Sequence, residues 1–257
     1  MELLTEKTTV LIAGIDDATK CPVIGSIFLA GVIADKSTID HWKKIGVNDS
    51  KLIAAKKREE LAQIIKETAT GFVIEEITPA MIDDKSFNLN EWEMLVVLKI
   101  VKKLSKFGMP SPIIIDNWET SEKGFKQRLH NLLSSELKSK VRAKKFIFNS
   151  NKLLKLSYLA EHKADENHII VGAASILAKT SSDAQYRSYR KKFGDFGSGS
   201  PADPKTRHFV WQHRHNPLPI IRTSWNTFKT LSQLDSIEQD FLYNRVKKRA
   251  IKLKSLT

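Results

Sequence analysis

The sequence from Val10 to Pro22 reads VLIAGIDDATKCP, and this stretch decides the fold. An apolar run over residues 10–15 ends in two adjacent carboxylates, Asp16 and Asp17. Short apolar runs that are rich in Val and Ile and bounded by Gly and Pro are typical of buried strands. A buried strand that carries carboxylates needs a neutralising partner, because an unpaired buried charge is costly. A divalent cation is one such partner, and a solvated turn that leaves the pair exposed is the alternative.

The composition predicts a globular chain with a polyanionic partner. The 257 residues are 41% hydrophobic and 28% charged, which is usual for a globular protein with a proper core. Lys and Arg number 42 against 29 Asp and Glu, a net charge of +13. Such a balance favours nucleic acid as the partner. An anionic membrane surface is the competing partner, but the basic residues are spread along the chain rather than gathered on one amphipathic helix.

The sequence gives no sign of secretion or of membrane insertion. Cys21 is the single cysteine, which excludes an internal disulfide and a cysteine-based zinc cluster and suits a reducing compartment. The first residues lack the cationic start and apolar core of a signal peptide. The longest near-apolar stretch, 23–34, is too short to span a bilayer. We expect a soluble, cytoplasmic protein without a membrane partner.

Hydrophobic periodicity predicts a mixed α/β core followed by helices. An early pair of strands forms a hairpin, and helices and strands then alternate. The expected strands are 9–16, 22–34, 71–78, 111–116 and 145–148, and the expected helices are 55–68, 89–107, 124–138, 169–192, 205–215 and 226–254.

Further acidic residues stand where strands end or helices begin. Asp116 closes the apolar strand, Asp165 precedes the long helix at 169–192, and Asp183 lies within that helix. Ligands of open α/β sheets bind outside the carboxyl ends of the strands, so these carboxylates can converge with the first pair. Oxygen ligands suit hard cations such as Mg²⁺, and two ions about 4 Å apart can catalyse phosphodiester hydrolysis. The ordinary alternatives are a helix cap for Asp165, a solvated position for Asp183 and a turn for Asp116.

Several motifs, in this order, resemble type 2 ribonuclease H (ribonuclease HII) over roughly residues 9 to 230. The form of the loop near residue 200 is closest to the archaeal and eukaryotic branch. The motifs are GIDDATKCP, GVNDSK at 46–51, IIID at 113–116, HKAD with VGAASILAK at 162–179, GSGSPADPKT at 197–206 and RTSWNT at 222–227.

The resemblance implies a ribonuclease H-like fold, in which helices flank a mixed five-stranded sheet. It implies a catalytic core over 1–195 and a helical C-terminal extension with a basic tail over 196–257. The implied activity is cleavage of RNA in RNA–DNA hybrids and of duplex DNA at embedded ribonucleotides. Cleavage would use Mg²⁺ or Mn²⁺ in a two-metal reaction that leaves a 3′-hydroxyl and a 5′-phosphate. Archaeal and bacterial relatives act alone, whereas eukaryotic ones are catalytic subunits of a larger complex; we expect a monomer.

The resemblance also assigns roles to single residues. The family's four catalytic carboxylates, which bind the metal, correspond to Asp16, Asp17, Asp116 and Asp165, and Asp183 corresponds to a supporting acidic position at the metal. The Asp-Ser-Lys motif places Asp49 and Lys51 near the cleaved phosphate, with Lys51 as the phosphate contact. From the residues alone, that motif is a solvated loop before a helix.

The chain departs from the family pattern at three places. Asp17 stands where the family has Glu, so its carboxylate is one methylene shorter. Thr19-Lys20-Cys21 replaces Gly-Arg-Gly, whose glycines let the backbone approach the ribose 2′-hydroxyl. Ser200 replaces a tyrosine that stacks beside the ribonucleotide sugar. We expect Thr19, Lys20, Cys21 and Ser200 to be substrate-binding positions with altered ribose sensing.

Three functions are compatible with these departures. The first is a working ribonuclease H with altered substrate sensing and a changed metal preference. The second is a catalytically weakened or inactive ribonuclease H-fold protein that binds nucleic-acid duplexes through its basic surface. The third is another metal nuclease of the same fold that acts on DNA.

Overall fold

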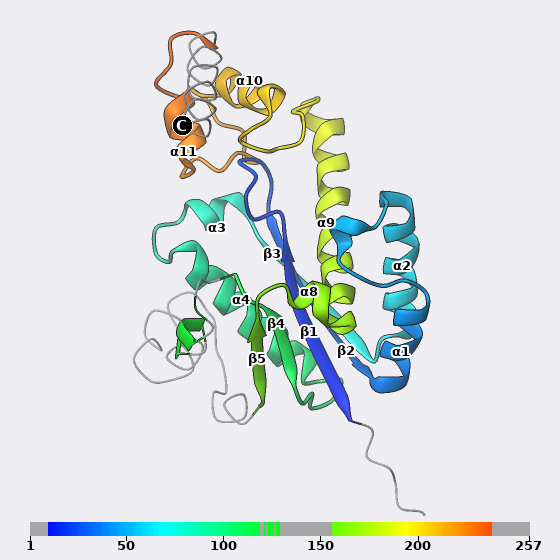
Figure 1. Ribbon diagram of the computed structural model, residues 1–257. Coiled ribbons are helices and arrows are strands. Elements are labelled where there is room, and N and C mark those ends of the chain that lie inside the picture. Colours follow the sequence, from blue (N-terminus) through cyan, green and yellow to red (C-terminus); the bar gives the residue numbers. More distant parts are fainter. Residues whose placement is uncertain (1–9, 119–120, 122, 126, 129–155, 238–257) are drawn as a thin grey trace, which may run out of the picture. The chain divides into compact units, whose positions relative to one another are not determined.

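The computed structural model describes residues 10–118, 121, 123–125, 127–128 and 156–237 (Figure 1). The strands are β1 (Leu11–Ala18), β2 (Ile27–Asp35), β3 (Gly71–Ile77), β4 (Ile113–Asp116) and β5 (Tyr158–Glu161). The helices are α1 (Lys36–Lys44), the short 3₁₀ turn η1 (Ser50–Leu52), α2 (Ala55–Thr68), α3 (Pro79–Asp83), α4 (Leu89–Leu104), α8 (Ala164–Asn167), α9 (Ile169–Phe193), α10 (Pro204–Gln212) and α11 (Asn226–Leu231).

The strands form one mixed sheet in the order β3-β2-β1-β4-β5, with β1 at its centre. β1 pairs antiparallel with β2, and β2 pairs antiparallel with β3. β1 pairs parallel with β4, and β4 with β5. The predicted hairpin and the ribonuclease H-like topology of a mixed five-stranded sheet flanked by helices are therefore confirmed.

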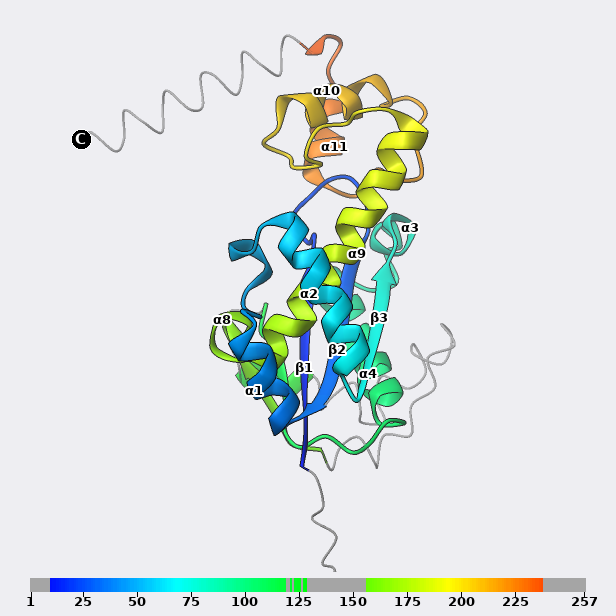
Figure 2. The same ribbon diagram turned by 90° about the vertical axis from the view of Figure 1, so that its right-hand side faces the viewer.

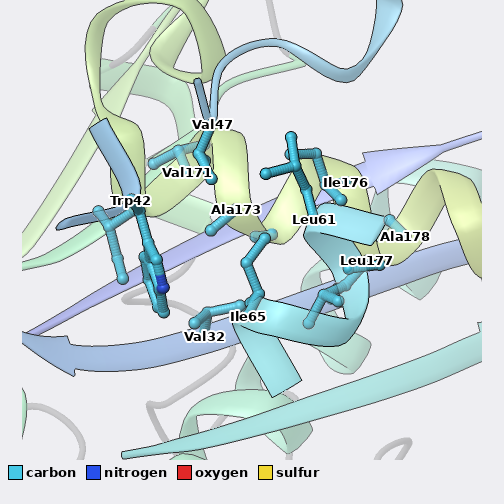
Figure 3. Close-up of a cluster of buried hydrophobic side chains, with 14 of the residues drawn as sticks. Val32, Trp42, Val47, Leu61, Ile65, Val171, Ala173, Ile176, Leu177 and Ala178 are labelled. Atoms are coloured by element: carbon cyan, nitrogen blue, oxygen red, sulfur yellow. The ribbon is translucent and has the colours of Figure 1, made fainter. Parts of the chain in front are cut away.

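Helices cover both faces of this sheet (Figures 1 and 2). Helix α4 packs on one face, against β2 and β3. α1, α2 and the first part of α9 lie on the other face. Their apolar side chains form a continuous core with those of the sheet, in which Trp42 of α1, Leu61 and Ile65 of α2, and Val171 of α9 are fully buried (Figure 3). Burial of this core is the main favourable term that holds the layers together.

Local sequence signals explain where the elements begin. Asn88 accepts a hydrogen bond from the backbone N–H of Glu91, and the Glu91 side chain accepts one from the backbone N–H of Asn88. This capping box satisfies two backbone donors at the start of α4. Residues 94–98 of α4 are all apolar and buried, whereas Lys102 and Lys103 in its last turn are exposed.

The chain divides into two compact units that alternate along the sequence. Unit 1 comprises Met1–Ala18, Ile27–Ile77 and Asn88–Asp183, and it holds the sheet. Unit 2 comprises Thr19–Ser26, Thr78–Phe87 and Ala184–Thr257, and its own core includes Phe196, Phe209 and Ile221. The expected division into a core up to residue 195 and an extension from 196 stays a prediction.

Some predicted boundaries need correction. The strand expected over 22–34 begins only at Ile27, because Val23 and Gly25 donate their backbone N–H groups to Gly199 and Ile220 instead of to a strand. The helix expected over 89–107 ends at Leu104. The fifth strand is Tyr158–Glu161, which the periodicity did not predict.

The remaining expected elements are either confirmed or lie outside the described residues. The helices expected over 55–68, 169–192 and 205–215 correspond to α2, α9 and α10. The strand expected at 145–148 lies outside the described residues, as does most of the helix expected over 124–138. The helix expected over 226–254 corresponds to α11, which ends at Leu231, and its residues from 238 onwards are not described. Among the described helices, none is both long enough and apolar enough to cross a membrane.

Candidate active site

Two of the predicted site carboxylates lie on neighbouring strands at the same edge of the sheet. β1 and β4 are parallel neighbours with Ile15 opposite Ile115, so Asp16, which lies inside β1, follows this pairing as Asp116 does at the end of β4. Side chains alternate along a strand, which places Asp16 on the face of Gly14 and Asp17 on the opposite face. The carboxylates of the pair therefore reach this edge from the two sides of β1.

Asp16 is buried beside other carboxylates. Its side chain is buried, with only 5% of the residue exposed. Burial, together with the negative charges of Asp17 and Asp116, raises the pKa of Asp16 well above its ordinary value. The hydroxyl of Ser175 on α9 forms a hydrogen bond with the Asp16 carboxylate and acts in the opposite direction. A bound cation would stabilise the charged form of a buried carboxylate that lies among like charges.

Asp116 is held by the segment that leads into α8. The backbone N–H of Ala164 donates to Asp116 Oδ1 at 2.8 Å. Lys163, just before it, has a left-handed backbone with φ of 59°, which turns the chain at this point. Burial raises the pKa of Asp116 to about 6, although the Ala164 hydrogen bond works against that rise. The charges of Asp165 and Asp17 add to it.

Asp165 on α8 lies beside the Asp-Ser-Lys turn. Its side chain is buried, and Lys51 Nζ lies 3.4 Å from Asp165 Oδ2 and 3.9 Å from Asp49 Oδ1. Burial and the neighbouring Asp49 raise the pKa of Asp165, and the Lys51 charge opposes this. Burial opposes the charged form of Lys51, but Asp165 and Asp49 outweigh it and raise the pKa of Lys51. The lysine therefore stays a cation at this edge of the sheet.

Buried side chains fix the Asp-Ser-Lys turn in place. Asp49 caps η1, because its Oδ1 accepts the backbone N–H of Lys51 at 2.9 Å. The hydroxyls of Ser50 and Ser175 lie 2.9 Å apart in the interior. Ser175 in turn contacts Asp16, so a chain of two hydroxyls joins the turn to the first carboxylate.

Asp183, the fifth predicted acidic residue, is already paired with two cations. Arg58 Nη1 lies 2.7 Å from its Oδ2, and Lys179 Nζ lies 2.6 Å from its Oδ1. In the part of the chain that the structure describes, no three His, Cys, Asp or Glu side chains are grouped tightly enough to hold a metal ion as they stand. The site carboxylates act on one another electrostatically, and like charges without a neutralising cation repel.

The predicted ribose-sensing turn belongs to unit 2, where one arginine anchors it. Arg222 is fully buried, and its guanidinium donates to the carbonyl oxygens of Thr19, Lys20 and Gly25, each at 2.7 Å. Thr19 has a φ of 74°, a left-handed backbone that a β-branched residue rarely adopts. The turn thus has a backbone conformation that glycine would adopt without strain.

Ser200 lies in a loop of unit 2 that is joined to the same turn. The backbone N–H of Val23 donates to the carbonyl of Gly199 at 2.9 Å, so the structure brings the turn and the loop together. The Ser200 hydroxyl accepts the backbone N–H of Ala202 at 3.2 Å. Asp203 caps α10 and also accepts from Ser198, which closes the loop.

Sequence reasoning missed four residues that organise the site. Ser50 lies in the GVNDSK motif, Arg58 lies further along in α2, and Ser175 lies in the VGAASILAK motif. Arg222 opens the RTSWNT motif directly after the apolar pair at 220–221, and an arginine in such a place is a signal for a buried anchor. Ser50 and Ser175 carry no such signal, because their hydroxyls are far apart in the sequence and meet only in the folded chain.

Comparison with known proteins places the chain in a family. The sequence profile of the family described as Ribonuclease HII matches residues 13–228. The chain belongs to the ribonuclease HII family. Ribonuclease HII of Methanococcus maripaludis (strain C6 / ATCC BAA-1332) is 36% identical over 249 residues, which is 95% of each chain. Ribonuclease HII of Thermococcus sibiricus is 34% identical over 86% of this chain and 91% of that protein. Family membership makes the chain a hydrolase of the ribonuclease class.

Solved structures of ribonuclease HII type agree in fold. The ribonuclease H2 from Pyrococcus horikoshii OT3 matches with a TM-score of 0.71 and 28% identity over 87% of this chain and 98% of that one. Ribonuclease HII of Archaeoglobus fulgidus, solved in a complex with PCNA, matches with a TM-score of 0.68 and 29% identity over 84% and 96%. The ribonuclease HIII solved with Mn²⁺ is 16% identical at a TM-score of 0.66, which shows a shared fold alone.

Proposed function

We propose that this ribonuclease HII is a metal-dependent endonuclease that cleaves RNA in RNA–DNA hybrids and duplex DNA at embedded ribonucleotides. The observation that carries the proposal is the edge of the sheet where Asp16, Asp116 and Asp165 lie with Lys51. Burial raises the pKa of Asp16 and of Asp116, the charge of Asp165 adds to both rises, and the chain as a whole carries a net charge of +13. The products would carry a 3′-hydroxyl and a 5′-phosphate.

The donor set fits Mg²⁺ or Mn²⁺. The candidate ligands are carboxylate oxygens, which hard divalent cations prefer. Asp16, Asp17, Asp116 and Asp165 would hold the metal, and a cation would favour the charged form of carboxylates whose pKa is raised by burial and by their neighbours' charge, as it is for Asp16 and Asp116. When bound, such ions act as Lewis acids and lower the pKa of coordinated water. Asp17 approaches from the other face of β1 with a short side chain, which supports a metal preference different from that of a Glu-bearing relative.

Lys51 is the group in this site best suited to hold the substrate phosphate. Its side chain is 76% exposed although its ammonium is anchored beside Asp165 and Asp49. A phosphate that approaches the carboxylates would meet this cation first. The pairing orients the ammonium before substrate arrives, so little side-chain entropy is lost on binding.

The turn and loop of unit 2 are the proposed ribose-binding elements. Arg222 holds Thr19, Lys20 and Gly25 by their carbonyls, so the turn is rigid although it lacks the family's glycines. The side chains of Thr19 and Cys21 leave less room than glycine would for a ribose 2′-hydroxyl to approach the backbone of the turn. Ser200 offers a hydroxyl, already engaged with Ala202, but no ring on which a sugar could stack. These features support weaker discrimination of the 2′-hydroxyl.

A cleavage assay tests the proposal. The substrates are a long RNA–DNA hybrid and a DNA duplex with one embedded ribonucleotide, each in Mg²⁺ and in Mn²⁺. We expect cleavage by the native chain and a loss of at least about a hundredfold in Asp165→Asn, because a metal ligand is removed. Absence of cleavage of both substrates with both ions would refute the proposal.

The second candidate function is duplex binding without cleavage, and the three departures near the site favour it. It predicts tight, salt-sensitive binding of the hybrid. It also predicts that any residual cleavage is equal in the native chain and in Asp165→Asn. The same assay therefore separates the two functions.

A further inference from the structure

Arg58 on α2 ties the Asp-Ser-Lys turn to the body of unit 1. Its Nε donates to the carbonyl of Ser50 at 3.0 Å, and its Nη2 donates to the carbonyl of Ile53 at 2.9 Å. These two carbonyls lie at the start and just past the end of η1, so one guanidinium holds both sides of the turn. The planar fork of arginine can make these bonds together, whereas a lysine ammonium could not reach both carbonyls and Asp183.

Asp183 balances the charge of this arginine. The Arg58 side chain is 11% exposed, and its remaining nitrogen, Nη1, donates to Asp183 Oδ2 at 2.7 Å. A buried guanidinium without a counter-charge would be costly. The other oxygen of Asp183 accepts from Lys179 one turn earlier on α9. Both oxygens of Asp183 thus have cationic partners, and a metal ion bound there would compete with them.

The turn held by Arg58 carries two links to the candidate active site. Ser50 reaches Asp16 through the hydroxyl of Ser175, and Lys51 lies beside Asp165. A shift of this turn would therefore move the Lys51 ammonium.

We propose that Asp183 is a positioning residue that acts through Arg58 on the Asp-Ser-Lys turn, and that it is not a metal ligand. Asp183 fixes the guanidinium, the guanidinium fixes the backbone of η1, and η1 places Lys51 for the substrate phosphate. The assignment of the phosphate to Lys51 rests on the proposed function, whereas the tie between Asp183 and the turn does not.

The first experiment measures the turn and the metal without any cleavage. In Asp183→Asn, we expect the backbone amides of residues 51–53 to exchange hydrogen about tenfold faster. We expect the affinity for MnCl₂, measured by calorimetry, to change less than about twofold. Asp165→Asn provides the comparison and should weaken Mn²⁺ at least about tenfold. Asp40→Asn, which removes the exposed Lys36–Asp40 pair of α1, is the matched control and should change neither quantity.

The second variant separates charge from geometry. Arg58→Lys keeps a cation beside Asp183 but cannot bridge the carbonyls of Ser50 and Ile53. We expect the same rise in exchange at residues 51–53 as in Asp183→Asn, again with Mn²⁺ binding unchanged. Arg58→Lys therefore still tests the proposal if Asp183→Asn fails to fold.

A double-mutant cycle then connects the turn to the substrate. Lys51→Ala should weaken binding of an RNA–DNA hybrid by about tenfold or more, as expected for a charged contact. Asp183→Asn should weaken binding in the native background and add little once Lys51 is gone. Loss of Mn²⁺ affinity in Asp183→Asn to the extent seen in Asp165→Asn would overturn the proposal, as would unchanged exchange in both variants. A native chain that never cleaves would refute the proposed function alone.

Discussion

Thr19 has a backbone conformation that residues with a Cβ rarely adopt. Its φ is 74°, and its carbonyl oxygen accepts a hydrogen bond from Arg222. We predict that Thr19→Gly raises the free energy of unfolding by roughly 1 kcal/mol, because relief of left-handed strain outweighs the greater entropy of glycine in the unfolded chain. Urea titration measures this change. Thr19→Ala keeps the Cβ and should give no such gain. Equal stability of the native chain, Thr19→Gly and Thr19→Ala would show that the backbone at this position is not strained.

Asp116 stabilises the metal-free protein more when it is protonated than when it is charged. Its folded-state pKa of about 6 exceeds the ordinary 3.8, so the folded state binds more protons than the unfolded state between these values. Stability therefore falls as pH rises from about 4 to about 6. We predict that Asp116→Asn raises the unfolding free energy of metal-free protein by roughly 2–3 kcal/mol at pH 7, and by much less at pH 4.

Thermal melting in a chelator at the two pH values measures the effect of Asp116→Asn. The same variant should lose cleavage, since a candidate metal ligand is gone. If Asp116→Asn is less stable than the native chain at pH 7, the charged carboxylate does not destabilise the fold and the prediction is wrong.

At the scale of elements, the approach of α9 to β1 depends on Gly14. A Cβ added there would lie 2.4 Å from the carbonyl oxygen of Ile170, a backbone atom that cannot swing aside. We predict that Gly14→Ala lowers the free energy of unfolding by roughly 3 kcal/mol or more, because the helix or the strand must shift. Chemical denaturation provides the measurement.

Gly46→Ala is the control for Gly14→Ala. A Cβ at Gly46 meets no atom within 4 Å, although its φ is 90°. We expect it to cost only about 1–2 kcal/mol, the strain of the left-handed backbone. Similar losses in the two variants would mean that close packing at Gly14 is not the limiting factor.

At the scale of the whole molecule, the net charge of +13 predicts binding dominated by phosphate contacts. We expect affinity for an RNA–DNA hybrid to fall about a hundredfold or more between about 50 and about 200 mM salt, through release of counterions. Lys51→Ala should reduce the slope of the salt dependence by about 1, if Lys51 contacts one phosphate. Fluorescence anisotropy over a salt series tests this, and binding independent of salt would contradict it.

The elements that the sequence predicted well are those with strong local signals. β3 and β4 lie close to their expected bounds, β1 overlaps its expected range but runs on to Ala18, and α2, α9 and α10 overlap theirs. β5 was missed because Tyr158–Glu161 has no apolar run of its own and becomes a strand by pairing with β4. The apolar pattern predicts a strand that includes residues 22–26, but the side chains of Val23 and Ile24 pack in the core of unit 2 instead.

The sequence by itself determined the family, the order of most strands and helices along the chain, and the identity of the candidate carboxylates, because motifs and periodicity are local. Only the tertiary structure decided which charges meet. It brought Lys51 to Asp165, Arg58 to Asp183 and Arg222 to the turn at Thr19, contacts whose partners are far apart in the chain. A side chain's neighbours, burial and pKa depend on the packing of several elements at once, and no local pattern carries that information.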